Sequence, residues 1–309
     1  MSRLVVGISY ATLAVLLMSI FYGYLTTLYL VDEVYDGNGP RELELAEKFT
    51  VRVLIEGGDG GPALSRFVST YSLCQSVEEV QVIWLDKAEG SAPPPSPSDF
   101  VYAHTHSRVS FHTVAATAAA QPLSATVLSQ AGLATVATET VLLLDVGVEA
   151  ECADLAFAHN VWRSGKGTLV GFFPRLHRHY PDTKQYTYYG WLHVWWNGIY
   201  SILLPKGLFV SKVLLQKLGA SNELSAALQL RPECVDMALS AFAAADNGRP
   251  PVWANVPVRL GREKSRESTA ELAVGAECLA ALAAALKVER LPYSRHKSSR
   301  ASSFVFWSL

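Results

Sequence analysis

The first long run of apolar positions lies at the N-terminus of the chain. Residues 4–31 contain no charged side chain, and Asp32 and Glu33 follow them. This run exceeds the roughly 20 residues that a helix needs to cross a bilayer. Because Arg3 is the only positive charge beside it, the positive-inside rule places residues 1–3 in the cytoplasm and the rest of the chain on the opposite side. We therefore expect a signal-anchor that crosses the membrane once, with no second apolar run of similar length.

A cleaved signal peptide is the alternative interpretation of this run. Its apolar region is typically about 7–15 residues long and ends at a small-residue cleavage site. Here the run is longer, and bulky residues occupy positions 25–30. The pattern therefore favours an uncleaved anchor. The polar and acidic segment 32–48, with Gly37, Gly39 and Pro40, is expected to be a stem.

Beyond the stem, short apolar runs bounded by turn residues alternate with longer helical patterns. The expected strands are 49–55, 80–85, 140–145 and 169–173, with strand-like segments at 199–204 and 252–256. One expected helix ends at 73, and the others cover 113–133, 153–163, 205–218 and 232–245. This alternation predicts an α/β domain over 49–309, with a mainly parallel sheet covered by helices. Ligands of such sheets bind at the carboxyl ends of the strands.

Composition narrows the classes of function. The chain has 309 residues with 26 Lys and Arg against 28 Asp and Glu, a formal net charge of -2. Nucleic acid is therefore not the expected partner, because domains that bind nucleic acid are usually strongly basic. Half of the residues are hydrophobic, which is enough for a substantial core.

Several common motifs are absent or incomplete. The glycine run at 57–61 lacks the spacing of dinucleotide-binding and P-loop motifs, and there is no G-x-S-x-G. His104 with His106 and His177 with His179 could each offer two zinc ligands. Because the sequence nominates no third and fourth ligand, surface or packing roles are favoured for them.

One acidic residue and one aromatic run carry candidate chemistry. Asp145 ends a buried apolar strand, where a carboxylate could hold Mg or Mn together with phosphate oxygens. The same position would also suit a helix cap or a loop hydrogen bond. Tyr and Trp residues are frequent at 186–200. Their pattern alone favours core packing over a wall that stacks on sugars.

In chain order, these landmarks resemble the exostosin-type glycosyltransferase domain, glycosyltransferase family 64. The matching segments are Phe49-Thr50-Val51, Val82-Ile83-Trp84, Val141-Leu142-Leu143-Leu144-Asp145, Asp154-Leu155-Ala156-Phe157 with Val161-Trp162, Val170-Gly171-Phe172-Phe173-Pro174-Arg175 with His177, Gly190-Trp191, Val194-Trp195-Trp196-Asn197-Gly198-Ile199-Tyr200-Ser201, Cys234-Val235-Asp236, Cys278 and Pro292-Tyr293-Ser294. The segment around Trp195 resembles the plant branch most closely. The resemblance implies a Rossmann-like GT-A fold, a UDP-sugar donor, Mn and retaining transfer in the secretory pathway.

The resemblance also implies a set of site residues. Asp145 would hold Mn, and Asp236 would be catalytic. Substrate would be bound by Arg175, Trp195, Trp196 and Tyr200. Cys234 and Cys278 would form a disulfide, and Cys74 with Cys152 is a second candidate pair.

The chain departs from the family pattern at charged positions. The acidic metal motif continues from Asp145 with Val146 and Gly147, and Val235 replaces one acid beside Asp236. Other departures are Ile55-Glu56-Gly57-Gly58 after the first strand, Ser124-Ala125-Thr126-Val127 ahead of the metal strand, and a missing His and Arg within 272–277. Glu56, Asp59, Glu149 and Glu151 remain as substitutes for a lost carboxylate. Removing a group that stabilises developing charge typically costs about a hundredfold in rate or more.

Two functions therefore stay open. One is a type II Golgi or ER membrane enzyme that transfers a hexosamine-type sugar from a UDP-sugar to a glycan or glycolipid. The other is an inactive relative that binds a glycan or assists another Golgi glycosyltransferase, or that serves only as a luminal scaffold. The chain contains no N-x-[ST] sequon, so we expect no N-glycosylation.

Overall fold

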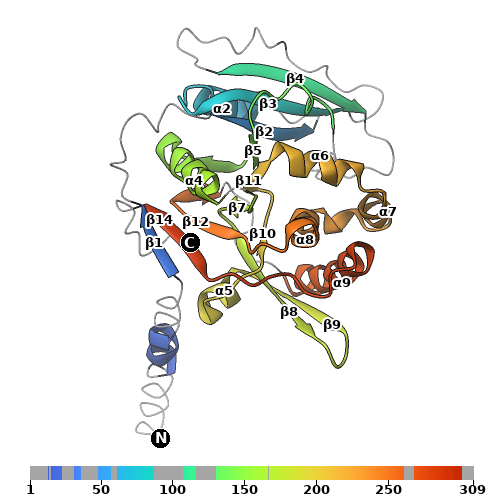
Figure 1. The fold of residues 1–309 in the computed structure, drawn as a ribbon. Helices are drawn as coiled ribbons and strands as arrows, with labels where there is room; N and C mark the ends of the chain where they lie inside the picture. The colour runs from blue at the N-terminus through green and yellow to red at the C-terminus, as the bar shows by residue number, and fades with distance from the viewer. Residues whose placement is uncertain are drawn as a thin grey trace, which may run out of the picture.

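A computed structural model of the chain shows one α/β unit built on a long mixed sheet (Figure 1). It describes residues 13, 15–22, 31–35, 48–56, 61–86, 96, 107–115, 130–165, 167–260 and 268–300. The main sheet has nine strands in the order β1-β14-β12-β7-β11-β5-β2-β3-β4. Its strands are β1 (Val31–Tyr35), β2 (Phe49–Glu56), β3 (Val77–Asp86), β4 (Arg108–Ala115), β5 (Thr140–Leu144), β7 (Val170–Gly171), β11 (Gly207–Ser211), β12 (Val252–Asn255) and β14 (His296–Arg300).

Only β11 runs against its neighbours in this sheet. It pairs antiparallel with both β5 and β7, whereas the other neighbouring pairs are parallel. The mainly parallel α/β sheet expected from the sequence is thus confirmed. Two small sheets, with strand orders β10-β8-β9 and β13-β6, flank it. Their strands are β6 (Val148–Ala150), β8 (Pro174–Tyr180), β9 (Gln185–Tyr189), β10 (Ile202–Leu203) and β13 (Val258–Leu260).

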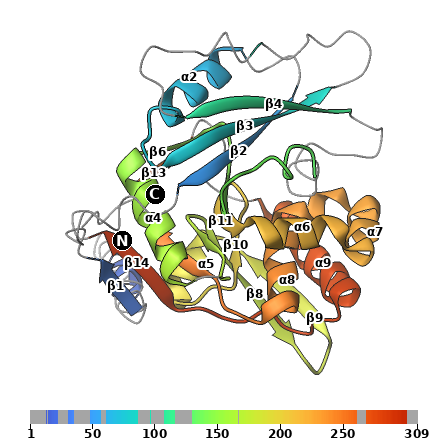
Figure 2. The ribbon, with the colours of Figure 1, turned by 45° about the horizontal axis from the view of Figure 1, so that its top comes forward.

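Helices cover both faces of the main sheet (Figures 1 and 2). They are α2 (Gly61–Tyr71), α4 (Cys152–Ser164), α5 (Trp191–Asn197), α6 (Lys212–Ala220), α7 (Asn222–Leu230), the short 3-10 turn η3 (Pro232–Cys234), α8 (Val235–Asn247) and α9 (Thr269–Leu286). Strand β5 shows how the two faces are formed. Leu142 and Leu144 pack in the core under α2 and α4, and Val141 and Leu143 pack in the core under α6 to α9. Because alternate side chains point to opposite faces, a strand covered on both faces must be apolar throughout.

Two expected helices differ from the structure. The alanine-rich segment 113–133 has a helical composition, but its first residues belong to β4 and residues 131–135 form turns. Residues 116–129 lie outside the described residues. Within the expected helix 205–218, residues 207–211 form β11 and the helix begins only at Lys212. The side chain of Ser211 accepts the backbone N–H of Leu214 and caps α6, so a strand and a helix meet at this residue.

The segment 32–48, expected to be a stem, begins as a strand. Residues 31–35 form β1, which pairs in parallel with β14 near the C-terminal end of the chain. The edge of the sheet thus consists of two segments that are far apart in the sequence. Figure 1 shows β1 and β14 side by side, with the N-terminal helix below them.

Of the expected span 4–31, the structure describes residues 13 and 15–22, which are helical, and Val31 in β1. Within the described part of the chain, the helix that is long and apolar enough to cross a membrane is α9. Glu271 and Glu277 interrupt α9, so it has no uncharged run comparable to residues 4–31. One face of α9, with Gly275, Cys278, Leu279 and Leu282, is buried against the domain. We therefore assign α9 to the domain.

Candidate functional site

Asp145 lies at the carboxyl end of β5, in the middle of the main sheet. Its backbone N–H donates to the carbonyl of Lys206, which precedes the neighbouring strand β11. Its side-chain Oδ1 accepts the backbone N–H of Gly147 at 2.8 Å. Among the described residues, the structure gives Oδ2 no hydrogen-bond partner. The half-buried carboxylate is thus fixed by one oxygen and retains the other for a ligand.

The chain after Asp145 forms β6, and Tyr71 of α2 holds this strand in place. The Tyr71 hydroxyl donates to the carbonyl of Val148 at 2.9 Å and accepts the N–H of Ala150 at 3.1 Å. Burial raises the pKa of this hydroxyl, so it stays protonated as the donor. Tyr71 therefore links the turn at Asp145 to the helix that follows β2.

The two acids nearest to Asp145 in the sequence do not gather beside it. Glu149 is the exposed middle residue of β6 and forms an ion pair with Arg66 of α2 at 2.8 Å. Glu151 is exposed and precedes α4 without making a side-chain cap bond. Of the other two substitutes, Asp59 and the side chain of Glu56 lie outside the described residues. Within the described chain, the turn thus offers one carboxylate.

Asp236 lies in the first turn of α8 and is half-buried. Four residues later on the same helix face, Ser240 donates to the carbonyl of Leu203 and accepts its N–H, both at 3.1 Å. Residues four apart share a face of a helix, so Asp236 is on the face that packs against β10. In the next strand, β8, Arg175 pairs with Ile202 of β10. Asp236 and Arg175 therefore belong to adjacent layers of the structure.

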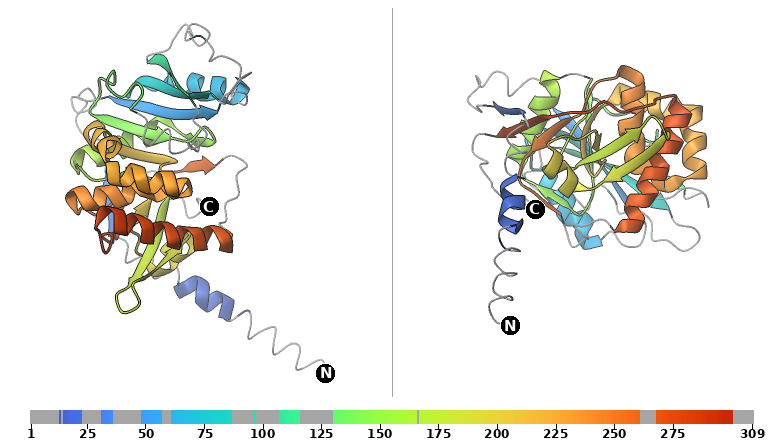
Figure 3. Two further views of the ribbon diagram at one scale, coloured as in Figure 1. Left: turned by 90° about the vertical axis from the view of Figure 1, so that its right-hand side faces the viewer. Right: turned by 90° about the horizontal axis from the view of Figure 1, so that it is seen from below.

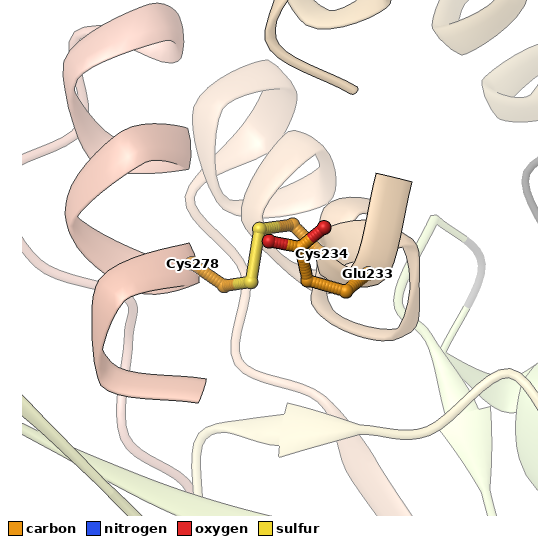
Figure 4. Close-up of side chains that lie close together, drawn as sticks. All are labelled: Glu233, Cys234 and Cys278. Carbon is orange, nitrogen blue, oxygen red and sulfur yellow. A yellow bond between two sulfur atoms is a disulfide. The ribbon is translucent and has the colours of Figure 1, made fainter. Parts of the chain in front are cut away.

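Both expected disulfides are present in the structure. Cys234 and Cys278 join the start of α8 to α9, with 5.0 Å between their Cα atoms. Cys74 and Cys152 join the turn after α2 to the start of α4, with 5.3 Å between their Cα atoms. Cys234 of the first bridge lies two residues before Asp236, so the bridge fixes the first turn of α8 against α9. Figure 4 shows it beside the carboxylate of Glu233.

Glu233, Cys234 and Cys278 are also the one group of three metal-ligating side chains within reach of one another among the described residues. Metal binding by cysteine requires thiolates. Both sulfur atoms are joined in the disulfide here. This group is therefore a covalent link between two helices.

The expected substrate-binding residues lie at different depths. Arg175 is half-buried, and its Nη1 donates to the carbonyl of Pro174. On α5, Trp195 is half-buried and Trp196 is 37% exposed. Tyr200 is fully buried. These four side chains therefore offer surface to a ligand only at Arg175 and α5.

The hydroxyl of Tyr200 has its partners inside the protein. Its single O–H faces the carbonyls of Pro251 and His296, and its oxygen accepts from the N–H of Trp253 and the hydroxyl of Ser294. Burial raises the pKa of this hydroxyl. Tyr200 thereby joins α5 to β12 and β14, and we assign it to the frame of the site.

A row of buried and half-buried polar side chains on β2, β3 and β4 was not predicted from the sequence. Arg52 Nη2 donates to the carbonyl of Ala131 at 2.9 Å, and burial lowers the pKa of its guanidinium to about 10. Gln81 Nε2 donates to the carbonyl of Gly132 and lies 3.2 Å from His112 Nε2. These side chains hold segment 130–136, which leads into β5 and Asp145. The available signal was Arg52 itself, a charged residue on the face of β2 opposite its apolar face.

His177 is a second buried polar residue of this region. Its Nδ1 lies 2.6 Å from Ser201 Oγ, and its ring stacks on Tyr293. Burial lowers its pKa to about 4, so the imidazole is neutral near pH 7. His177 thus joins β8 to the C-terminal segment, whose Ser294 also contacts Tyr200. This is a packing role. The other histidine pair, His104 and His106, lies outside the described residues.

The mixed sheet, with a carboxylate at the end of a central strand and helices on both faces, defines a Rossmann-like α/β domain. The model of the glycosyl transferase family 64 domain matches residues 49–304. The chain belongs to this family, as its sequence predicted.

Two curated relatives come from Arabidopsis thaliana. "Glycosylinositol phosphorylceramide mannosyl transferase 1" is 34% identical over 125 residues, which are 38% of this chain and 36% of that protein. "Glycosyltransferase family protein 64 C3" is 25% identical over 241 residues, which are 75% of this chain and 68% of that protein. The match thus spans about a third of the length of the first relative. Both support the predicted likeness to the plant branch.

Solved structures of glucosyl-3-phosphoglycerate synthase from Mycobacterium tuberculosis resemble this chain at a more distant level. One, in complex with Mn2+, UDP-glucose and phosphoglyceric acid, aligns with a TM-score of 0.47 and 13% identity over 84% of this chain and 88% of that chain. Another, in complex with UDP, aligns with a TM-score of 0.45 and 14% identity over 84% and 88%.

Proposed function

We propose that the protein is a membrane-anchored glycosyltransferase that moves a sugar from a nucleotide-sugar donor, a UDP-sugar by first choice, to a glycolipid acceptor. The observation that carries this proposal is Asp145, held by Gly147 at the end of β5 with one carboxylate oxygen available. In α/β sheets this edge is where ligands bind. Membership of family 64 supports the transfer of a sugar as the reaction.

A divalent cation such as Mn fits this position if the donor supplies further oxygen ligands. Mg and similar ions are often held by one or two carboxylates, with substrate phosphates and water supplying the other ligands. The described turn supplies only Asp145, because Glu149 is paired with Arg66. We therefore propose that the cation binds together with the diphosphate of the donor. Once bound, it would neutralise charge on the leaving nucleotide.

The chain's own groups would perform the remaining tasks. Asp236, on the face of α8 that packs against β10, would stabilise the reacting sugar or position the acceptor. Arg175 of β8 is the half-buried cation of this region and would balance negative charge on the donor. Trp195 and Trp196 offer flat rings suited to a sugar face.

The acceptor and the sugar are proposed on different grounds. The name of the first relative refers to a phosphorylceramide glycolipid and to mannose, which supports a glycolipid acceptor. The sequence resemblance implies a hexosamine-type sugar. Both classes of donor therefore belong in the same experiment.

The proposed location is the ER or Golgi membrane, with the domain in the lumen. All four cysteines lie in disulfides, which form and persist in oxidising compartments. The apolar N-terminal helix would supply the type II anchor. Another Golgi glycosyltransferase would be a natural partner there.

An inactive glycan-binding or partner protein is the second candidate. The single carboxylate at the turn after β5 and the partly exposed Trp196 favour it. The two candidates differ in the fate of a bound nucleotide-sugar, because only the enzyme transfers its sugar to an acceptor.

The test is transfer by the full chain reconstituted in vesicles that contain glycosphingolipid. Labelled UDP-hexosamines and nucleotide-activated mannose are supplied as donors, and labelled lipid is measured. We expect transfer by the wild type and a loss of about a hundredfold or more in Asp236→Asn, while Ser225→Ala, at a half-buried position of α7, stays active. Nucleotide binding without transfer from any donor would favour the inactive candidate.

A further inference from the structure

We infer that the outer face of α5 lies in the headgroup region of the bilayer, beside the N-terminal helix. This inference rests on the proposed membrane anchoring and extends it to the domain itself. It concerns Leu192 and Trp196, which we call the α5 outer face.

The first observation is the N-terminal helix. Val15, Leu16, Leu17 and Met18 are 66%, 58%, 57% and 70% exposed. Successive residues of a helix point about 100° apart, so four in a row cover every side of it. A helix that is apolar on all sides is buried in a large protein or spans a membrane. The domain does not cover these side chains, so lipid is the environment that suits them.

The second observation connects this helix to the domain. Tyr22, at the end of the described part of the helix, packs against Trp196 of α5, with 5.0 Å between the ring centroids. Leu192 lies one turn before Trp196 and is 61% exposed. The exposed apolar surface thus continues from the N-terminal helix onto α5. Figure 3 shows the N-terminal helix leaving the domain on the side where α5 and the β8–β9 hairpin lie.

The residue types fit the membrane–water boundary. Trp and Tyr are enriched at this level, where an apolar ring and a polar edge are both satisfied. The Tyr22–Trp196 pair would mark this level. The apolar side chains of 15–18 would then lie in the hydrocarbon region, one to two turns away.

Cations lie at both ends of α5. Arg178 of β8 donates to Asn197 in the last turn of α5 at 2.8 Å. Lys297 lies over the ring of Trp253, which packs edge-on against Trp191 at the start of α5. Segments 174–200 and 287–300 together hold eight Lys and Arg but only two acids, in a chain with a net charge of -2. One of the eight, Arg300, is paired with Asp154 of α4. This local excess of positive charge complements anionic lipid headgroups.

This placement has a consequence for the acceptor. Arg175 lies on β8 three residues before Arg178, so the strand that borders the lipid surface also leads to the candidate site. A sugar attached to a membrane lipid would reach the domain from this side. A soluble acceptor would need no such placement.

The test uses the full chain with one added cysteine. Because every native cysteine is in a disulfide, a dye reacts only with the added one. An environment-sensitive dye is attached to Leu192→Cys, to Leu17→Cys in the N-terminal helix, or to Leu230→Cys. Leu230 is 84% exposed and ends α7, which lies far from the N-terminal helix in Figures 1 and 2. The proteins are reconstituted in phosphatidylcholine and phosphatidylserine vesicles that carry spin-labelled lipids at shallow or deep positions.

We expect shallow spin labels to quench the dye at 192 several-fold more strongly than at 230, and deep labels to quench the dye at 17. Quenching at 17 with equal, weak quenching at 192 and 230 would overturn the placement of α5 and leave the anchor standing. No quenching at 17 would overturn the anchor and this inference together. A dye at 192 shielded from both lipid and water would place a protein partner on α5 instead.

Discussion

The carboxylate of Asp145 accepts the backbone N–H of Gly147 at 2.8 Å, through Oδ1. This bond gives the residue a structural role in addition to its proposed role in binding a cation. The two roles can be separated, because asparagine retains an acceptor oxygen and loses the charge.

We expect Asp145→Asn to leave the free energy of unfolding nearly unchanged. Asp145→Ala removes the acceptor as well and should lower it by about 1 kcal/mol, the usual worth of such a bond. Urea denaturation of the two variants measures this difference. Equal stabilities would show that the turn does not depend on the Asp145 side chain.

The bridge between Cys234 and Cys278 should contribute substantially to stability. It closes a loop with a sequence separation of 44. The entropy of such a loop in the unfolded chain corresponds to about 4 kcal/mol. Replacing both cysteines by serine should therefore lower the free energy of unfolding by an amount of this order, measured in denaturant. A change below about 1 kcal/mol would mean that the unfolded chain is already constrained there.

Buried His177 and His159 predict loss of stability in mild acid. Burial lowers the pKa of each to about 4, from a usual 6.5. Between these values the unfolded chain binds more protons than the folded chain, so the free energy of unfolding falls as the pH falls. Each histidine contributes about 3 kcal/mol across this window.

Urea denaturation between pH 7 and pH 4 tests this prediction. His177→Gln should flatten the pH dependence. The matched control is His193→Gln, on the exposed surface of α5, which should leave the slope as it is. An unchanged slope in His177→Gln would contradict the assignment.

Gly132 should not tolerate a side chain. Its φ is +66°, and a Cβ there would lie 2.4 Å from the ring of His112. The control is Gly248, whose φ is +65° but where a Cβ would meet nothing within 4 Å. Gly248→Ala should cost about 1 kcal/mol for the strained backbone alone. Gly132→Ala should cost about 1–3 kcal/mol more, because the added carbon overlaps a packed ring. Equal costs would show that His112 moves away freely.

Sequence was informative where local pattern and burial agree. β5 was predicted because five consecutive apolar or β-branched residues are typical of a strand covered on both faces. Helix α8 was predicted from the residue pattern, and both disulfide pairs were predicted from the family resemblance. The acidic position of Asp145 at the end of β5 was predicted in the same way.

Sequence misled where composition and pattern conflict. In β4, the alternation of Val109, Phe111 and Thr113 was outweighed by the alanines that come after it. In β11, three apolar residues before a helix look the same as its first turn. β1 carries two acids and gains its place only by pairing with β14, a long-range contact without a local signature. For the same reason the role of Arg52 under segment 130–136 was visible only in three dimensions.

The most direct test of the proposed function is the binding of UDP to the full chain, by calorimetry with and without Mn. We predict binding that requires the metal and is lost in Asp145→Asn, although this variant stays as stable as the wild type. Binding that is independent of Mn and unchanged in Asp145→Asn would contradict the proposed role of Asp145, as would the absence of UDP binding by the folded protein.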